Sequence, residues 1–129
     1  MAAQPLTFII QSAAIERVHY ALMMAASSAA LGGAVTLFFG VGAADILKST
    51  GEVVAGDSEF SRKLNAANIA SIADLLEALV ELDCRITVCD AALAFAALEA
   101  GDLRVDIAIE VTGLTDILAN LNSGQIIYV

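Results

Sequence analysis

The sequence contains few of the residue types that build metal and acid–base sites. It has one histidine, His19, together with two cysteines, one proline and no tryptophan. A single histidine makes a zinc or iron site not credible, and it leaves no Ser-His-Asp arrangement that can be argued. Metal-ligand spacing is also missing from the acidic residues in the middle of the chain, Asp45, Glu52, Asp57 and Glu59. We therefore expect neither a bound metal nor a cofactor.

Positive charge is also scarce. Six Lys and Arg residues stand against fifteen Asp and Glu, which gives a formal net charge of −9. Apart from the adjacent pair Arg62-Lys63, the basic residues are scattered along the chain. Phosphate backbones are bound by clustered Lys and Arg, so the composition argues against a nucleic-acid partner.

The sequence offers little support for membrane insertion or secretion. An uncharged run of 25 residues, Tyr20 to Ala44, is long enough to cross a bilayer. However, Gly32-Gly33 divides the run and no Lys/Arg flank or aromatic belt accompanies it, so a helix, a turn and a buried strand explain it better than a membrane span. The start, Met1 to Pro5, lacks the basic region of a signal peptide. We expect a cytoplasmic protein.

The two cysteines, Cys84 and Cys89, are not expected to form a disulfide. Five residues apart on a strand, their Cα atoms would lie about 16 Å apart, whereas a disulfide needs about 7 Å or less. Their odd spacing also directs the two side chains to opposite faces. A reducing compartment fits this pattern.

Apolar residues are abundant, at 59% of the chain, against about 45–50% in average soluble domains. We expect one domain over residues 1–129, because this length can bury a core of its own. The apolar excess exceeds what one small core can hide. It therefore predicts a homo-oligomer, with the 48–68 segment and the Ala- and Met-rich face of the first helix as candidate contacts.

Short β-branched and apolar runs alternate with Ala- and Leu-rich helical stretches. Strands are expected at Leu6–Ile10, Ala34–Phe39, Arg85–Cys89, Val105–Val111 and Gln125–Val129, and helices at 12–31, 43–47, 71–82, 90–100 and 113–121. Ser12, Ser71 and Thr115 are the expected helix N-caps, and 48–68 is expected to be a long loop with a helical turn at most. Such alternation indicates parallel strands joined by crossover helices. The predicted fold is a three-layer α/β/α domain with a mainly parallel, about five-stranded, flavodoxin-like sheet, Leu6–Ile10 being central.

A candidate reactive centre lies at the junction of the third strand with its helix. Cys89 ends the β-branched run, and unpaired backbone N–H groups at the start of a helix favour a thiolate, the reactive form. In parallel sheets, ligand sites lie beyond the carboxyl ends of the strands. Three loops should therefore meet there, and their residues are the expected cleft lining: Gln11, Ser12, Gly40, Val41, Gly42 and Asp90. Cys84 is expected to be a packing residue, and His19 to lie about 10 Å along its helix from the site.

Three segments in this order resemble the DsrE/DsrF-like family: the first strand and helix, Gly33 to Gly40, and Arg85 to Leu93. The resemblance implies a small α/β subunit that forms trimers or hexamers. It also implies a part in sulfur relay, with sulfur carried as a persulfide on Cys89 and exchanged with donor and acceptor proteins.

The sequence therefore predicts a cytoplasmic sulfur-relay protein, possessing sulfurtransferase or sulfur-carrier activity, in which Cys89 takes sulfur from a donor and passes it to an acceptor thiol. Two alternatives stay open. One is a non-catalytic binding or scaffold subunit of the same fold, and the weaker one is a thiol that reduces peroxides.

Overall fold

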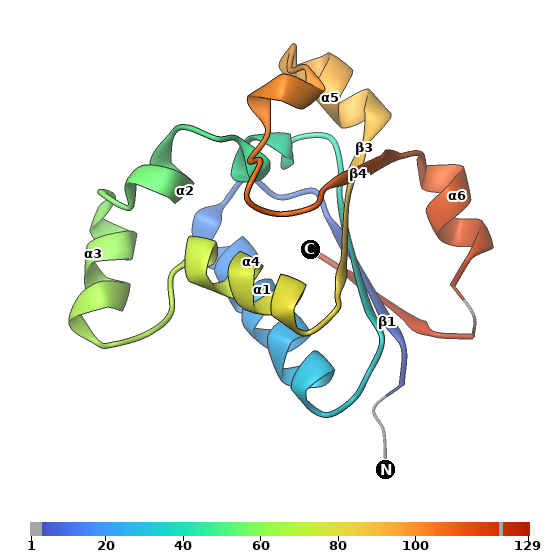
Figure 1. Cartoon of the computed structure of the whole chain (residues 1–129), viewed down its shortest axis with the longest axis horizontal. Helices are drawn as coiled ribbons and strands as arrows, with labels where there is room; N and C mark the ends of the chain where they lie inside the picture. Colours follow the sequence, from blue (N-terminus) through green and yellow to red (C-terminus); the bar gives the residue numbers. More distant parts are fainter. Residues whose placement is uncertain (1–3, 122) are drawn as a thin grey trace.

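The structure, a computed structural model, describes residues 4–121 and 123–129. Of the sequence expectations, the first three residues of the Met1–Pro5 start and Asn122 of the expected turn lie outside these ranges. The described chain is built on a five-stranded sheet in which every neighbouring pair is parallel (Figure 1). The strands are β1 (Leu6–Ile10), β2 (Val35–Phe39), β3 (Arg85–Cys89), β4 (Glu110–Thr112) and β5 (Gln125–Tyr128), in the spatial order β4-β3-β2-β1-β5.

The predicted α/β class with a parallel sheet is confirmed, and the strand order adds a detail that the sequence did not contain. Successive strands add outward from β1 to β4, and the chain then returns to place β5 on the free side of β1. β1 is thus an inner strand, but the middle position belongs to β2. The reversal comes after the fourth strand, whereas the flavodoxin order 2-1-3-4-5 reverses after the second.

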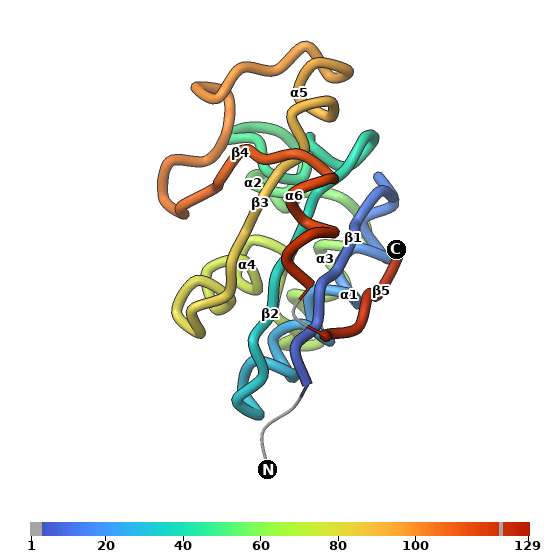
Figure 2. The backbone as a smooth tube through the Cα atoms, turned by 90° about the vertical axis from the view of Figure 1, so that its right-hand side faces the viewer, coloured from blue at the N-terminus to red at the C-terminus, as the bar shows by residue number. Residues whose placement is uncertain are grey.

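Helices cover both faces of the sheet. They are α1 (Ile15–Ala30), α2 (Glu52–Ala55), α3 (Glu59–Ala66), α4 (Ile72–Glu81), α5 (Asp90–Ala96) and α6 (Leu114–Ala119), with 3₁₀ turns η1 (Ala44–Leu47) and η2 (Ala100–Asp102). The helices α1 and α4 pack together on one face, α6 lies on the other, and α5 stands beyond the carboxyl ends of the strands (Figures 1 and 2). The core between the first face and α1/α4 contains the fully buried Phe8, Leu37 and Leu76.

Several local predictions are confirmed. The uncharged run divides into α1, a turn and β2, with Gly32 at a φ of +90° just after the helix, a conformation that glycine adopts without strain. Ser71 caps α4 and forms a capping box with Asp74. Across the described residues, no helix combines the length and the apolar character needed to span a bilayer.

Other boundaries were wrong. The expected loop 48–68 contains two helices, α2 and α3, the second capped by Ser58, whose Oγ accepts the Ser61 N–H. The N-cap residues of α1 and α6 are Ala14 and Gly113 rather than Ser12 and Thr115.

The helix after Cys89 is shorter than expected. It ends at Ala96, because Ala97 adopts the left-handed conformation with a φ of +54°. The turn lets the Leu98 N–H donate to the Leu93 carbonyl at 2.9 Å and lets Leu98 pack against the core. A helix running on to Ala100 would not allow this packing.

The expected strand Val105–Val111 is reduced to the three residues of β4. The cause is Arg104, whose side chain is 7% exposed and binds the Asp106 carboxylate through Nε and Nη2. The Arg104 N–H also donates to the Leu47 carbonyl. These contacts turn the chain so that Ile107 enters the core and Val105 is exposed, and pairing with β3 begins only at Glu110.

Candidate functional site

Cys89 lies at the carboxyl end of β3 and is followed at once by α5. Its register partner on β4 is Thr112, so both side chains project on the α6 face of the sheet. The carboxyl ends of β1 and β2 adjoin this position. Together these elements form a pocket of about 500 Å³, lined by Ile9, Gln11, Phe38, Gly40, Val41, Cys89, Asp90, Ala91, Leu114, Leu118 and Tyr128.

The pocket brings together five of the seven residues that the sequence placed at the site: Gln11, Gly40, Val41, Cys89 and Asp90. Cys89 itself is 8% exposed, and it lies in the wall of this pocket.

Ser12 and Gly42 are not among the lining residues, and both have local backbone roles. Ser12 Oγ accepts the Ala14 N–H at 3.1 Å. Gly42 has a φ of +99°, and a Cβ there would lie 2.8 Å from the Gln11 carbonyl oxygen. The turn after β2 therefore requires glycine to pass close to the end of β1. The Gly40 N–H donates to the Ile10 carbonyl at 2.7 Å, so it is not free to bind a ligand.

Sequence reasoning missed the walls contributed by the last third of the chain. Leu114 and Leu118 of α6 are about half exposed, at 47% and 46%, and Tyr128 of β5 is 68% exposed. The Tyr128 hydroxyl donates to Gln11 Oε1, which ties β5 to the loop after β1. The i, i+4 spacing of the two leucines was a visible signal of one apolar helix face, but their proximity to Cys89 depends on strand order.

Charge around Cys89 comes from Asp90. The Cys89 thiol lies 3.7 Å from Asp90 Oδ1 and donates to it, and the same oxygen accepts the Ala91 N–H at 2.7 Å. No Lys, Arg or His lines the described pocket. Arg85 projects on the same sheet face but pairs with Glu110 of β4 and Asp116 of α6.

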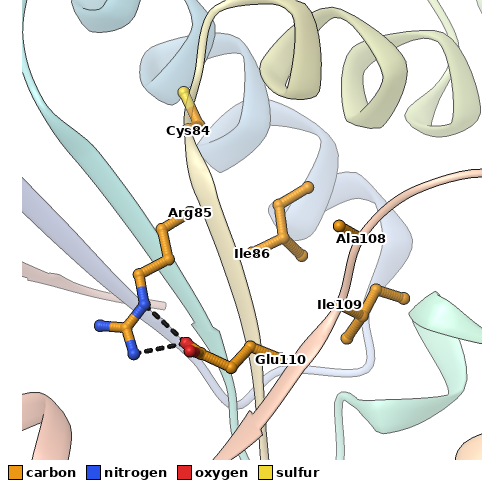
Figure 3. Close-up of a pocket in the computed structure, with 6 residues that line it drawn as sticks. All are labelled: Cys84, Arg85, Ile86, Ala108, Ile109 and Glu110. Atoms are coloured by element: carbon orange, nitrogen blue, oxygen red, sulfur yellow. Dashed lines mark hydrogen bonds and ion pairs between the residues drawn. The ribbon is translucent and has the colours of Figure 1, made fainter.

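A second, separate pocket of about 340 Å³ lies at the opposite end of β3, where Cys84 is found (Figure 3). It opens between the start of β3 and the segment leading into β4, with the Arg85–Glu110 ion pair at one side. Burial raises the pKa of the Cys84 thiol, and the negative charge of Asp83 raises it further. A thiol in this environment stays protonated and is a poor nucleophile.

His19 is 4% exposed and has a packing role. Its Nε2 lies 2.8 Å from the Ala70 carbonyl oxygen and donates to it in the tautomer that carries the proton on Nε2. Its ring packs edge-on against the Phe60 ring, with 5.4 Å between the ring centroids. It does not line the Cys89 pocket. In the described part of the chain, no group of three or more His, Cys, Asp or Glu residues could hold a metal ion.

Comparison with known proteins supports this architecture. The structure resembles the ychN protein from E. coli, with a TM-score of 0.69 and 14% identity over 100% of both chains. It also resembles MTH1491 from Methanobacterium thermoautotrophicum, a protein of unknown function, with a TM-score of 0.63 and 15% identity over 98% of this chain and 99% of that one. At these identities the likeness shows the fold alone. No curated protein sequence matches the chain. The model of the DsrE/DsrF-like family matches residues 4–128, and the chain therefore belongs to the DsrE/DsrF-like family.

Proposed function

We propose that the protein is a sulfur carrier that holds sulfur as a persulfide on Cys89. The observation that carries this proposal is the opening of the Cys89 side chain into an apolar pocket at the carboxyl ends of the strands. Membership of the DsrE/DsrF-like family supports it.

The chemistry requires only thiol exchange. The Cys89 thiolate attacks the outer sulfur of a donor persulfide, a new S–S bond forms at Cys89, and the donor's S–S bond breaks. The electron pair of the broken bond leaves with the donor thiolate. An acceptor thiolate then attacks the outer sulfur on Cys89, which regenerates the Cys89 thiolate and leaves the persulfide on the acceptor. No net oxidation or reduction takes place.

The pocket suits this cargo. Sulfur is polarizable and packs against apolar side chains, and Ile9, Phe38 and Leu118 provide such walls. The pocket volume of about 500 Å³ far exceeds one sulfur atom, so a side chain of the donor or acceptor can enter. Residence in the cytoplasm, and assembly into a trimer or hexamer, complete the proposal.

The alternative of a binding or scaffold subunit draws on two observations. Cys89 is 8% exposed, and its thiol donates to a carboxylate rather than facing a cation. A scaffold would keep the pocket without the sulfur chemistry. The weaker alternative, peroxide reduction, needs the same reactive thiol but would produce a sulfenic acid instead of a persulfide.

Mass spectrometry after polysulfide treatment separates these alternatives. We expect an adduct of about 32 Da, one sulfur atom, on the Cys89 peptide. Cys84→Ser is the matched control and keeps the adduct, whereas Cys89→Ser loses it. Modification of Cys84 alone, or of neither cysteine, would favour the scaffold role. A gain of about 16 Da with dilute hydrogen peroxide, without a persulfide, would favour the peroxidase role.

A further inference from the structure

We propose that the outer edge of β5 is a self-pairing surface, on which two copies of the chain align their β5 strands antiparallel to form one continuous sheet of ten strands. This inference rests on the proposal above that the chain assembles with itself, and it names the contact. It requires nothing of the chemistry at Cys89.

The backbone hydrogen bonds show which groups of β5 face β1 and which face away from it. The Gln125 N–H donates to the Pro5 carbonyl at 3.0 Å, and the Val129 N–H donates to the Ile9 carbonyl at 2.9 Å. In a parallel strand, alternate residues direct both N–H and C=O to the same neighbour. Residues 125, 127 and 129 therefore face β1, and Ile126 and Tyr128 direct their N–H and C=O groups outward. Among the described strands none lies beyond β5 (Figure 2).

The two edges of the sheet differ in how they are protected. Edge strands of soluble proteins are normally short, or carry charges, proline or bulges that prevent pairing with another chain. The β4 edge has three residues and presents Glu110 in an ion pair with Arg85. The β5 strand is also short, at four residues, but residues 117–129 include neither a charge nor proline. Its Ile126 and Tyr128 side chains are 42% and 68% exposed.

The charge of the chain favours this strand as the place where a second copy binds. Each chain carries a net charge of −9, so two copies repel one another wherever charged surfaces approach. An uncharged strand offers contact without placing like charges opposite each other. It also contributes backbone hydrogen bonds, which depend little on side-chain identity and suit a strand that pairs with itself.

A two-fold axis at Ile127 satisfies all four outward groups on each strand. Ile126 then lies opposite the partner's Tyr128, and Tyr128 opposite the partner's Ile126, each pair exchanging two hydrogen bonds. Side chains directly opposite in an antiparallel pair share a face, and aromatic–β-branched pairs of this kind are favourable. Since Tyr128 pairs in register with Ile9 and lines the pocket, both Cys89 pockets would open on the same face of the ten-stranded sheet.

The first test removes one outward donor. Ile126→Pro deletes an N–H that faces away from β1 and from every other described strand, and proline is tolerated in an edge strand when its position faces outward. Ile126→Thr is the matched control, because it removes the same apolar side chain but keeps the N–H. By light scattering we expect the wild type and Ile126→Thr to have a mass that is a multiple of two copies, 2 × 13.3 = 26.6 kDa, and Ile126→Pro to have half the wild-type mass.

A wild-type mass of one or three copies would overturn the pairing, as would an Ile126→Pro variant that keeps the wild-type mass. If Ile126→Pro keeps the wild-type mass, the chain still assembles with itself, and only the β5 contact is contradicted. Circular dichroism shows whether Ile126→Pro keeps the fold. The persulfide assay on Cys89 reports separately on the sulfur chemistry.

The second test reads the register and does not depend on a proline. The two-fold axis sets Ile127 opposite itself in a non-hydrogen-bonded pair, where Cα atoms lie about 4.5 Å apart, within disulfide range. Ile127→Cys should therefore give a disulfide-linked dimer on mild oxidation, with the link at position 127 identified by peptide mass spectrometry. Ile126→Cys is the control: the two copies of residue 126 lie about two residues out of register, beyond the roughly 7 Å limit, so it should not cross-link. Linkage at 126, or none at 127, would contradict the pairing.

Discussion

At the scale of single residues, Asp90 is the charged group nearest the Cys89 thiol that the site contains, and we expect it to affect the reactivity of that thiol. The Asp90 carboxylate accepts a hydrogen bond from the Cys89 thiol, with 3.7 Å between Sγ and Oδ1, so its negative charge lies beside any charge that a reaction develops on the sulfur. Because Asp90 is exposed, solvent weakens the repulsion well below the value of about 4 kcal/mol for two charges 4 Å apart at an effective dielectric constant of 20.

Asp90→Asn should therefore increase the rate of alkylation of Cys89 by iodoacetamide at neutral pH. We expect an increase of about three- to tenfold, corresponding to a repulsion of about 0.7–1.4 kcal/mol. Glu81→Gln is the control, because it removes the same charge from the exposed end of α4 and should leave the rate unchanged. An equal rate in Asp90→Asn would show that the carboxylate does not affect the thiol, and a lower rate that it activates the thiol; either result would contradict the prediction.

Glu52 provides a second prediction at this scale. Its Oε1 accepts the Ser58 N–H at 2.9 Å and the Ser61 hydroxyl at 3.0 Å. Hydrogen bonding with the Ser58 side chain, then with the Asp57 side chain and the Ser58 N–H, lowers the Glu52 pKa from 4.5 to about 2. A carboxyl whose pKa is lower in the folded state stabilises the fold above its unfolded pKa, and the contribution is lost as the pH falls toward the folded one. The loss should therefore fall between pH 4.5 and about 2.

Asp57 acts in the opposite direction, because the neighbouring Glu52 raises its pKa. The Glu52 test is therefore made in an Asp57→Asn background, where the amide can still donate. We expect Asp57→Asn to melt at a higher temperature than Asp57→Asn/Glu52→Gln at pH 7, and the difference to shrink toward zero near pH 2. A difference that is constant with pH would contradict this role of the ionised carboxylate.

At the scale of the elements, the capping box of α4 is the clearest local determinant. The Ser71 hydroxyl accepts the Asp74 N–H at 3.1 Å, and the Asp74 carboxylate accepts the Ser71 N–H at 3.2 Å. Ser71→Ala should lower the free energy of unfolding by about 1 kcal/mol, measured by urea denaturation. Ser27→Ala, within α1 and exposed, is the control and should cause no loss, because alanine is the better helix former. Equal losses would mean that the box does not stabilise α4.

The elements that the sequence predicted well are those with strong local signals. The apolar, β-branched runs gave β1, β2, β3 and β5, and the Ser71–Asp74 spacing gave the start of α4. The helix α3 was missed because it is short and mostly polar: only Leu64 in it is buried, and the single i, i+4 pair Phe60 and Leu64 is a weak helical signal. Gly101 suggested the wrong end for α5, since the helix ends at Ala96 and the left-handed residue after it is Ala97, a residue type that seldom adopts that conformation.

At the scale of the whole molecule, the general rule for parallel sheets located the site, and strand order decided its walls. The loops after β1, β2 and β3 meet as that rule requires. Placing α6 and β5 beside them requires β5 to return next to β1 rather than extend the sheet beyond β4. No local pattern encodes that choice, which depends on contacts between segments more than 100 residues apart, such as Gln11 with Tyr128.

Net charge leads to a prediction for the assembly as a whole. Two chains of −9 each repel over long range, while the proposed β5 contact contains no charge. Raising NaCl from 0.1 M to 1 M shortens the Debye length from about 10 Å to about 3 Å. Screening should therefore tighten the pairing, and we expect the dissociation constant from analytical ultracentrifugation to fall by about fivefold or more.

A charge variant separates repulsion from other effects of salt. Glu81→Lys changes the net charge from −9 to −7 (−9 + 2) at an exposed position of α4, away from β5. It should therefore pair more tightly than the wild type at 0.1 M NaCl and gain less from added salt. Glu81→Gln, at −8 (−9 + 1), should fall between them. Weaker pairing at high salt would instead reveal ion pairs across the contact, which an uncharged β5 strand cannot supply, and the contact would then have to lie on another surface of the molecule.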